Sequence, residues 1–176
     1  MISHLVRVAS LLCLVVAGCT KDRAVPSRQL MAETVQKDVE SMVRALYSGD
    51  FVTVLDYTHP VILQGVGGRE RALAAIEDSM SPMLKRGLRI ESFAFPRAPE
   101  FVETDRAVFA IVPTLSVLEL GGQRVESLNY QFAVLDGDRE TWRYVEGSRI
   151  KPDNVRLLFP SFPDGHRFPE IYRKNL

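Results

Sequence analysis

The sequence predicts an α+β domain in which three N-terminal helices pack on a curved antiparallel β-sheet, followed by an extended, proline-rich C-terminal segment. Apolar residues recur at three- and four-residue spacings as far as residue 86, which is typical of amphipathic helices. From residue 88 the apolar period becomes two, and turn sequences rich in glycine and aspartate separate the segments, as in antiparallel strands. Helices and strands are thus segregated along the chain, which indicates an α+β fold.

Three segments have the helical period. Residues 30–47 predict the first helix, and a short second helix begins after the N-cap candidate Asp50 and ends before Pro60. Residues 69–86 predict the third helix. Because Pro82 lies inside this segment, we expect a kink or a helix in two pieces.

Five segments have the strand period, and they cover residues 88–95, 101–103, 106–120, 123–135 and 141–146. Pro113 interrupts the third segment and predicts a bulge or a bend there. In the fourth segment, the alternation places Asn129 and Gln131 on one face of the sheet and the aromatic residues Tyr130 and Phe132 on the other.

Residues 148–176 contain four prolines among many apolar side chains. This composition is too apolar for a solvated tail, so we expect an extension that packs across the domain. A position along a sheet edge is favoured, because proline is tolerated there.

The composition excludes several classes of protein. A chain of 176 residues with 46% hydrophobic and 25% charged residues is long enough for one domain with a core and is unlike a disordered chain. The 22 basic residues balance the 22 acidic residues, so no nucleic-acid partner is expected. Two cysteines are too few for a disulfide-rich scaffold or a four-cysteine zinc site.

The first 18 residues have the features of a lipoprotein signal peptide. Arg7 gives a positive start, and residues 8–17 are almost wholly apolar. This run has about ten residues, whereas a membrane-spanning helix needs roughly 20. A plain signal peptide or a buried apolar N-terminal helix is the alternative interpretation.

The segment from Val16 to Cys19 resembles the bacterial lipoprotein box. The resemblance implies that the thiol of Cys19 carries lipid and that the signal peptide is cut just before it. Residues 19–29 are then the lipidated cysteine and a polar tether. The expected location is the bacterial cell envelope, anchored to the membrane by the lipid on Cys19, with the outer membrane facing the periplasm favoured in a Gram-negative host because Thr20 is not aspartate.

Residues 30–147 resemble the NTF2-like family, in which three helices and a bent antiparallel sheet form a cone. The resemblance rests on residues 45–51 (ALYSGDF), 67–70 (GGRE) and 138–145 (DRETWRYV). It implies a cone whose open end holds a small apolar ligand, and the C-terminal stretch resembles that of uncharacterised secreted NTF2-like proteins. The family includes a steroid isomerase, dehydratases, polyketide cyclases, transport adaptors, dimerisation modules and toxin-immunity proteins, so the fold alone does not define an activity.

The catalytic candidates are Asp56, Tyr57 and His59, which form a compact titratable group. A carboxylate that orients an imidazole could support proton abstraction. The alternative is that Asp56 and His59 lie on the exposed side at the end of a helix. These three residues cannot be matched to the catalytic pair of any NTF2-like enzyme.

The ligand-binding candidates are Tyr47, Asn129 and Gln131. Asn129 and Gln131 share a strand face that could bind a ligand, lie at a dimer surface or be an ordinary solvated face. No metal site and no cofactor are expected, because His166 is isolated in the tail and the mature chain has no usable thiol.

The favoured hypothesis is a membrane-anchored envelope lipoprotein that binds a small apolar ligand or a protein partner without catalysis. The first alternative is an enzyme of the cone pocket, with isomerase- or dehydratase-like acid-base chemistry at Asp56 or His59. The second is a structural homodimer or assembly factor joined through the outer face of the sheet.

Overall fold

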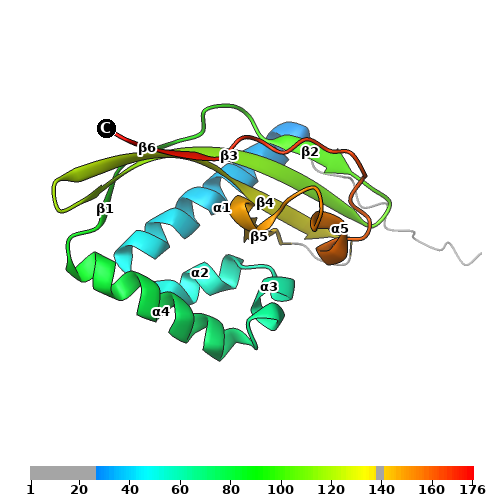
Figure 1. Cartoon of the computed structure of the whole chain (residues 1–176). Coiled ribbons are helices and arrows are strands. Elements are labelled where there is room, and N and C mark those ends of the chain that lie inside the picture. Colours follow the sequence, from blue (N-terminus) through cyan, green and yellow to red (C-terminus); the bar gives the residue numbers. More distant parts are fainter. Residues whose placement is uncertain (1–26, 138–140) are drawn as a thin grey trace, which may run out of the picture.

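The computed structural model describes residues 27–137 and 141–176 and shows an α+β fold with an open antiparallel sheet. The helices of the described part are α1 (Arg28–Ser48), α2 (Phe51–Tyr57), α3 (Pro60–Gly65), α4 (Arg69–Lys85), the 3₁₀ helix η1 (Gly147–Arg149) and α5 (Val155–Leu158). The strands are β1 (Arg89–Ala94), β2 (Glu100–Glu103), β3 (Ala107–Leu120), β4 (Gln123–Asp136), β5 (Arg143–Glu146) and β6 (Tyr172–Asn175). Helices α1 to α4 lie on one side of the sheet, and the C-terminal segment runs along the other (Figure 1).

Helix α1 has caps at both ends that its sequence supplies. The hydroxyl of Ser27 accepts a hydrogen bond from the backbone N–H of Leu30, and Gly49 ends the helix with a φ of 83°. The side chains at three- and four-residue spacings form a buried stripe of Met31, Val35, Val39, Met42 and Ala45. The predicted helix is therefore present, and it begins two residues earlier than expected.

The chain has one more helix before the sheet than the three predicted. Pro60 does not lead into a loop after α2, because it begins the additional helix α3. In the first turn of a helix its missing N–H costs no hydrogen bond. The Nδ1 atom of His59 caps this helix by accepting from the backbone N–H of Val61. Helix α4 runs as a single element through Pro82, so the expected division into two pieces is absent.

The sheet is built around a long hairpin of β3 and β4. Their pairing is unbroken from Ala107 opposite Asp136 to Leu120 opposite Gln123. The bulge predicted at Pro113 is absent from this pairing, and the irregularity lies instead in β1, between Ile90 and Ser92.

Each outer edge of the hairpin carries two short strands. Strand β2 pairs with residues 108–111 of β3 and strand β1 pairs with residues 115–119, so Pro113 lies between them. A proline there removes no hydrogen bond to either short strand. On the edge of β4, strand β5 pairs with residues 131–134 and strand β6 with residues 125–128.

The pair of Pro113 and Tyr130 divides the hairpin into two halves. The packed half comprises residues 107–112 of β3 and 131–136 of β4, and the open half comprises residues 114–120 and 123–129. The two halves differ in burial, since Val112 and Phe132 are 0% exposed, whereas Leu115 to Leu120 are only partly buried.

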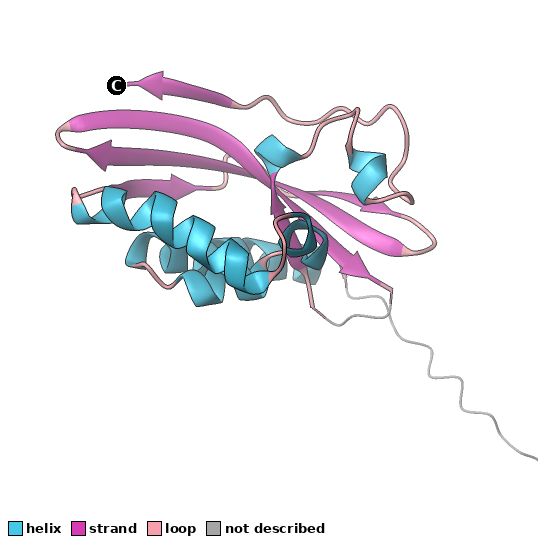
Figure 2. Ribbon diagram, turned by 60° about the horizontal axis from the view of Figure 1, so that its bottom comes forward, coloured by secondary structure: helices cyan, strands magenta, loops and turns pink. Residues whose placement is uncertain are grey.

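The packed half has a hydrophobic cluster on each face. Figure 2 shows the helix layer on one side of the sheet and the C-terminal segment on the other. On the helix side, Ala110, Val112 and Ala133 pack with α1, Trp142 and Tyr144. On the outer face the cluster consists of Phe109, Ile111, Tyr130, Phe132 and Val134 with Ile150, Val155, Phe159 and Phe162 of the C-terminal segment. A homodimer surface on the outer face, one of the alternatives from sequence, would therefore be limited to what this segment leaves uncovered.

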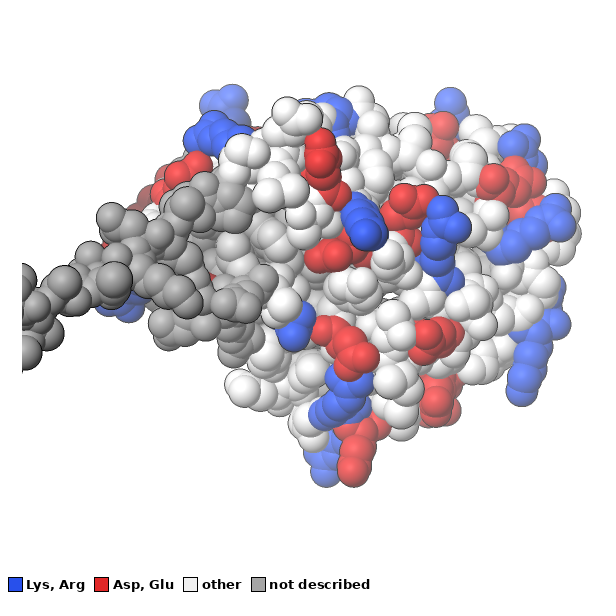
Figure 3. All heavy atoms as spheres, turned by 180° about the vertical axis from the view of Figure 1, so that it is seen from behind, with Lys and Arg blue, Asp and Glu red and all other residues white. Residues whose placement is uncertain are grey.

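The surface has no dominant sign of charge on the face seen from behind, where basic and acidic side chains are interspersed (Figure 3). Charged side chains of the sheet pair across strands, as Arg89 does with Glu119 and Arg124 with Glu91. Among the described helices, none is long and apolar enough to cross a bilayer.

Candidate functional site

A cavity of about 700 Å³ lies between the open half of the sheet and helices α1 to α4. Its helix-side lining is mostly apolar, and the side chains of Met42, Leu46, Ile76, Met80 and Met83 contribute to it. Helix α4 has only one buried residue, Ala72, because its apolar face covers this cavity instead of a packed core.

The sheet side of the cavity carries a polar stripe. It consists of Thr114 and Ser116 of β3 and Ser127, Asn129 and Gln131 of β4. These residues alternate with outward-facing residues along both strands, and Ser116 lies directly opposite Ser127. The face predicted to carry Asn129 and Gln131 is therefore the cavity face.

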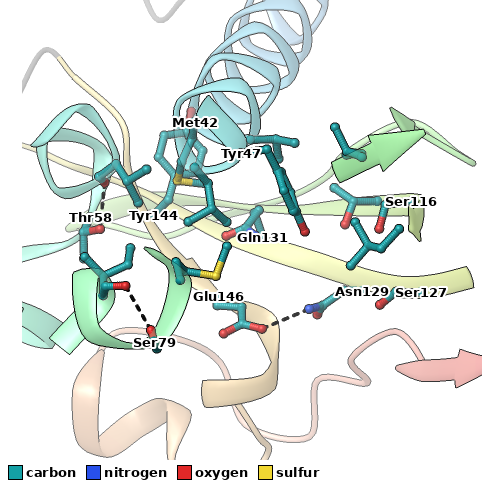
Figure 4. Close-up of a pocket in the computed structure, with 18 of the residues that line it drawn as sticks. Met42, Tyr47, Thr58, Ser79, Ser116, Ser127, Asn129, Gln131, Tyr144 and Glu146 are labelled. Carbon is teal, nitrogen blue, oxygen red and sulfur yellow. Dashed lines mark hydrogen bonds between the residues drawn. The ribbon is translucent and has the colours of Figure 1, made fainter. Parts of the chain in front are cut away.

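Tyr47 projects from the end of α1 into the same cavity. Its phenol reaches toward the strands that carry Ser116 and Asn129 (Figure 4). Burial raises the pKa of this phenol, and the negative charge of Glu146 adds to the effect while Arg173 opposes it. Tyr47 is thus a neutral hydrogen-bond donor and acceptor at neutral pH.

Asn129 lies where the edge of β4 changes its partner from β6 to β5. Its side-chain oxygen accepts from the backbone N–H of Tyr130 at 2.8 Å. Its amide nitrogen donates to a carboxylate oxygen of Glu146 at 3.2 Å (Figure 4). Asn129 therefore has two roles. Its side-chain oxygen gives the backbone N–H of Tyr130 a hydrogen-bond partner between strands β5 and β6, and its amide nitrogen orients the carboxylate of Glu146.

The charged lining residues are Glu146, Arg149 and Arg173. All three are exposed, so they mark an opening of the cavity along β5, η1 and β6. Arg173 comes from the last few residues of the chain, and β6 pairing with β4 carries it to the cavity. None of the three is among the site candidates from sequence. For Arg173 the reason is that no local pattern in the C-terminal segment predicts the pairing of β6 with β4.

The phenol of Tyr144 also lines the cavity but is committed to α1. It donates a hydrogen bond to Asp38 at 2.8 Å, and burial together with the Asp38 charge raises its pKa. This hydrogen bond joins strand β5 of the sheet to helix α1, and the raised pKa keeps the phenol of Tyr144 neutral.

The three catalytic candidates are not brought together. Asp56 faces solvent and forms an ion pair with Arg69 at 2.6 Å. Tyr57 packs edge-on against Tyr144, with ring centroids 6.0 Å apart. His59 is buried against Phe159, and its Nε2 atom lies 3.8 Å from Asp136.

The cavity lining does not include Asp56, Tyr57 or His59. These three residues therefore share no pocket in which they could perform the acid-base chemistry of the alternative hypothesis. Within residues 27–137 and 141–176, no group of three His, Cys, Asp or Glu side chains could hold a metal ion.

The chain matches no protein-family model, no curated protein and no solved structure. The site is therefore interpreted from its own geometry, which is an apolar cavity with a polar stripe on the sheet side and three charged residues at its opening.

Proposed function

We propose that this protein is a membrane-anchored envelope lipoprotein of NTF2-like fold whose cavity binds a small, largely apolar ligand without catalysis. The observation that carries the proposal is the cavity of about 700 Å³ between helices and sheet. Ligand pockets typically enclose roughly 300–1,000 Å³ and combine apolar walls with a few polar groups. This cavity has both properties.

The polar stripe supports binding over a plain packing defect. A cavity without a function gains nothing from hydroxyl and amide groups, because polar groups inside a protein cost free energy unless they are hydrogen-bonded. Here five such side chains face the same space from two adjacent strands. They would orient the polar part of a ligand while the methionines of α1 and α4 adapt to its apolar part.

The NTF2-like assignment is supported by the helices on one face of a curved antiparallel sheet and by two of the sequence motifs. In the first, Gly49 adopts a left-handed conformation and the carboxylate of Asp50 caps α2 by accepting from the N–H of Thr53. In the second, Gly67 and Gly68 have positive φ angles directly before α4. Residues 138–140 of the third motif lie outside the described residues.

The membrane anchor rests on the sequence from Arg7 to Cys19, which lies outside the described residues. Metabolic labelling with palmitate tests it. The wild type should incorporate label and fractionate with membranes, and Cys19→Ala should do neither. Equal labelling of the two proteins would contradict the anchor.

Ligand binding can be tested on a form without residues 1–19, since every described helix and strand lies within residues 28–175. N-phenyl-1-naphthylamine, a neutral apolar dye, fluoresces more strongly when it enters an apolar cavity. Ser116→Phe places a ring in the cavity, so the dye affinity should fall at least about tenfold, equivalent to roughly 1.4 kcal/mol.

Val117→Phe is the matched control, because Val117 is the next residue of β3 and faces the opposite side of the sheet. It should bind the dye as the wild type does. Equal binding by Ser116→Phe and the wild type would contradict the cavity as the binding site.

A further inference from the structure

The three charged residues at the cavity opening carry an inference about the class of ligand, and it rests on the proposed function. In an antiparallel pair, directly opposed residues point to the same face of the sheet. Glu146 is opposite Gln131, and Arg173 is opposite Ser127. Since Gln131 and Ser127 line the cavity, Glu146 and Arg173 face the cavity side from the two strands on that edge.

The charges at the opening are unequal. Glu146 already accepts a hydrogen bond from Asn129. Arg149 and Arg173 form no ion pair within 4.0 Å with any carboxylate of the described residues. Two guanidinium groups against one carboxylate leave a formal surplus of one positive charge at the opening.

Tyr47 adds a neutral donor close to these charges. Arg173 and Glu146 both influence its pKa, so both lie within electrostatic range of its hydroxyl. A phenol and two guanidinium groups are the donors that hold a carboxylate or a phosphate, and arginine does so through a bidentate geometry.

The rest of the described lining carries no charged side chain. Beyond the opening, the cavity continues among Ile76, Met80 and Met83 of α4 and Phe93 of β1. A ligand that fills the cavity therefore has a charged group only at the end near Arg149 and Arg173, and an apolar chain or ring system elsewhere.

We propose that the ligand is a single-chain amphipathic anion, with its carboxylate or phosphate head held by Arg149, Arg173 and Tyr47 and its apolar chain in the cavity. The Asn129 amide holds the Glu146 carboxylate beside the edge of β4. The free carboxylate and the phosphate ester are two sources of this chemistry, and the test separates them.

Four twelve-carbon competitors that differ only in the head group test the proposal. Dodecanoate, dodecyl phosphate, dodecanol and dodecyltrimethylammonium are each used to displace N-phenyl-1-naphthylamine from the form without residues 1–19, at pH 8 and low ionic strength. We expect at least one of the two anions to displace the dye at a concentration about tenfold or more below that of dodecanol, and the cation to be the weakest. The ratio between the two anions identifies the head group.

The combined variant Arg149→Gln with Arg173→Gln should reduce the anion-to-alcohol ratio to near one. The combined variant Arg149→Lys with Arg173→Lys should retain most of it, because the charge remains. Arg97→Gln is the matched control: Arg97 is exposed and does not line the cavity, so its ratio should equal that of the wild type.

The outcomes separate this inference from the proposed function. If dodecanol competes as well as the anions, or if the cation competes best, the head-group assignment is wrong while ligand binding stands. If the dye does not bind and none of the four compounds changes the melting temperature of the protein, the proposed function itself fails.

Discussion

The packed half and the open half of the β3–β4 hairpin are parts of the same two strands, yet they are covered differently. In the packed half, α1 lies on one face and the C-terminal segment on the other, and the side chains of Phe132 and Ala133, which point to opposite faces, are both 0% exposed. In the open half, the helix-side face borders a cavity, and Ser116 and Asn129 are only partly buried.

The difference fits the proposal that one end of the hairpin serves stability and the other serves binding. Tight packing around Phe132 supplies the apolar burial that stabilises the fold. This leaves the open half, together with Gln131 at its border, to carry the hydroxyl and amide groups that a packed core would exclude. Helix α4 covers the open half while contributing a single buried residue, so the close packing beside the cavity comes mainly from α1 and the sheet.

The largest expected effect compares one truncation in each half. Phe132→Ala removes a fully buried ring from the outer cluster and should lower the free energy of unfolding by about 3–5 kcal/mol. Leu118→Ala removes a partly buried side chain that borders the cavity, so the loss should be about 1 kcal/mol. Urea unfolding measures both, and equal losses would contradict the division into a packed and an open half.

A smaller effect concerns Tyr130, which lies at the boundary between the halves and donates a hydrogen bond to the carbonyl of Ile150 at 2.7 Å. Burial raises its pKa to about 12 from the ordinary 10.0. Between these values the unfolded chain loses the proton that the folded protein keeps, so stability falls as the pH rises. The slope from this residue is at most about 1.4 kcal/mol per pH unit, and little stability is lost through it below about pH 9.

Tyr130→Phe should be less stable than the wild type by about 1 kcal/mol at pH 8, because the hydrogen bond is gone. The difference should shrink as the pH rises above 10, vanish by about pH 11 and have the opposite sign at pH 11.5, since the variant has no proton to lose at this position. Urea unfolding across this range measures it, and a constant difference would show that Tyr130 does not titrate with the raised pKa.

The smallest effect is expected outside both halves, at Asp56. Its ion pair with Arg69 is exposed, with 63% of the aspartate side chain accessible, and such pairs contribute about 0–1 kcal/mol. Asp56→Asn should therefore change the melting temperature little and leave the affinity for N-phenyl-1-naphthylamine unchanged. A large loss of dye binding would bring Asp56 back as a site residue.

The sequence predicts the local features of the fold well. The two-residue alternation of β4 correctly separates Asn129 and Gln131 from Tyr130 and Phe132, because successive side chains of a strand point to opposite faces of the sheet. It cannot say what covers each face. The polar face suits water and a ligand cavity equally well, and only the position of α1 and α4 distinguishes them.

Two features have no reliable local signal. Pro60 predicts the end of α2, because proline disfavours helical geometry in the residue before it. The same residue begins α3, because proline is well suited to the first turn of a helix. Strand β6 is short and fully exposed, and it pairs with residues 125–128 of β4, more than 40 positions earlier. Without that pairing Arg173 is an ordinary charge in a C-terminal tail.

A titration followed by two-dimensional ¹H–¹⁵N NMR tests the central claim most directly. Dodecanoate is added to the form without residues 1–19, and the backbone amide signals of the two halves are compared. Binding in the cavity should shift the signals of Ser116, Ser127 and Asn129 strongly and leave those of Phe109 and Phe132 nearly unchanged. Shifts centred on the packed half, or no shifts at millimolar dodecanoate, would contradict the assignment of the cavity as the binding site.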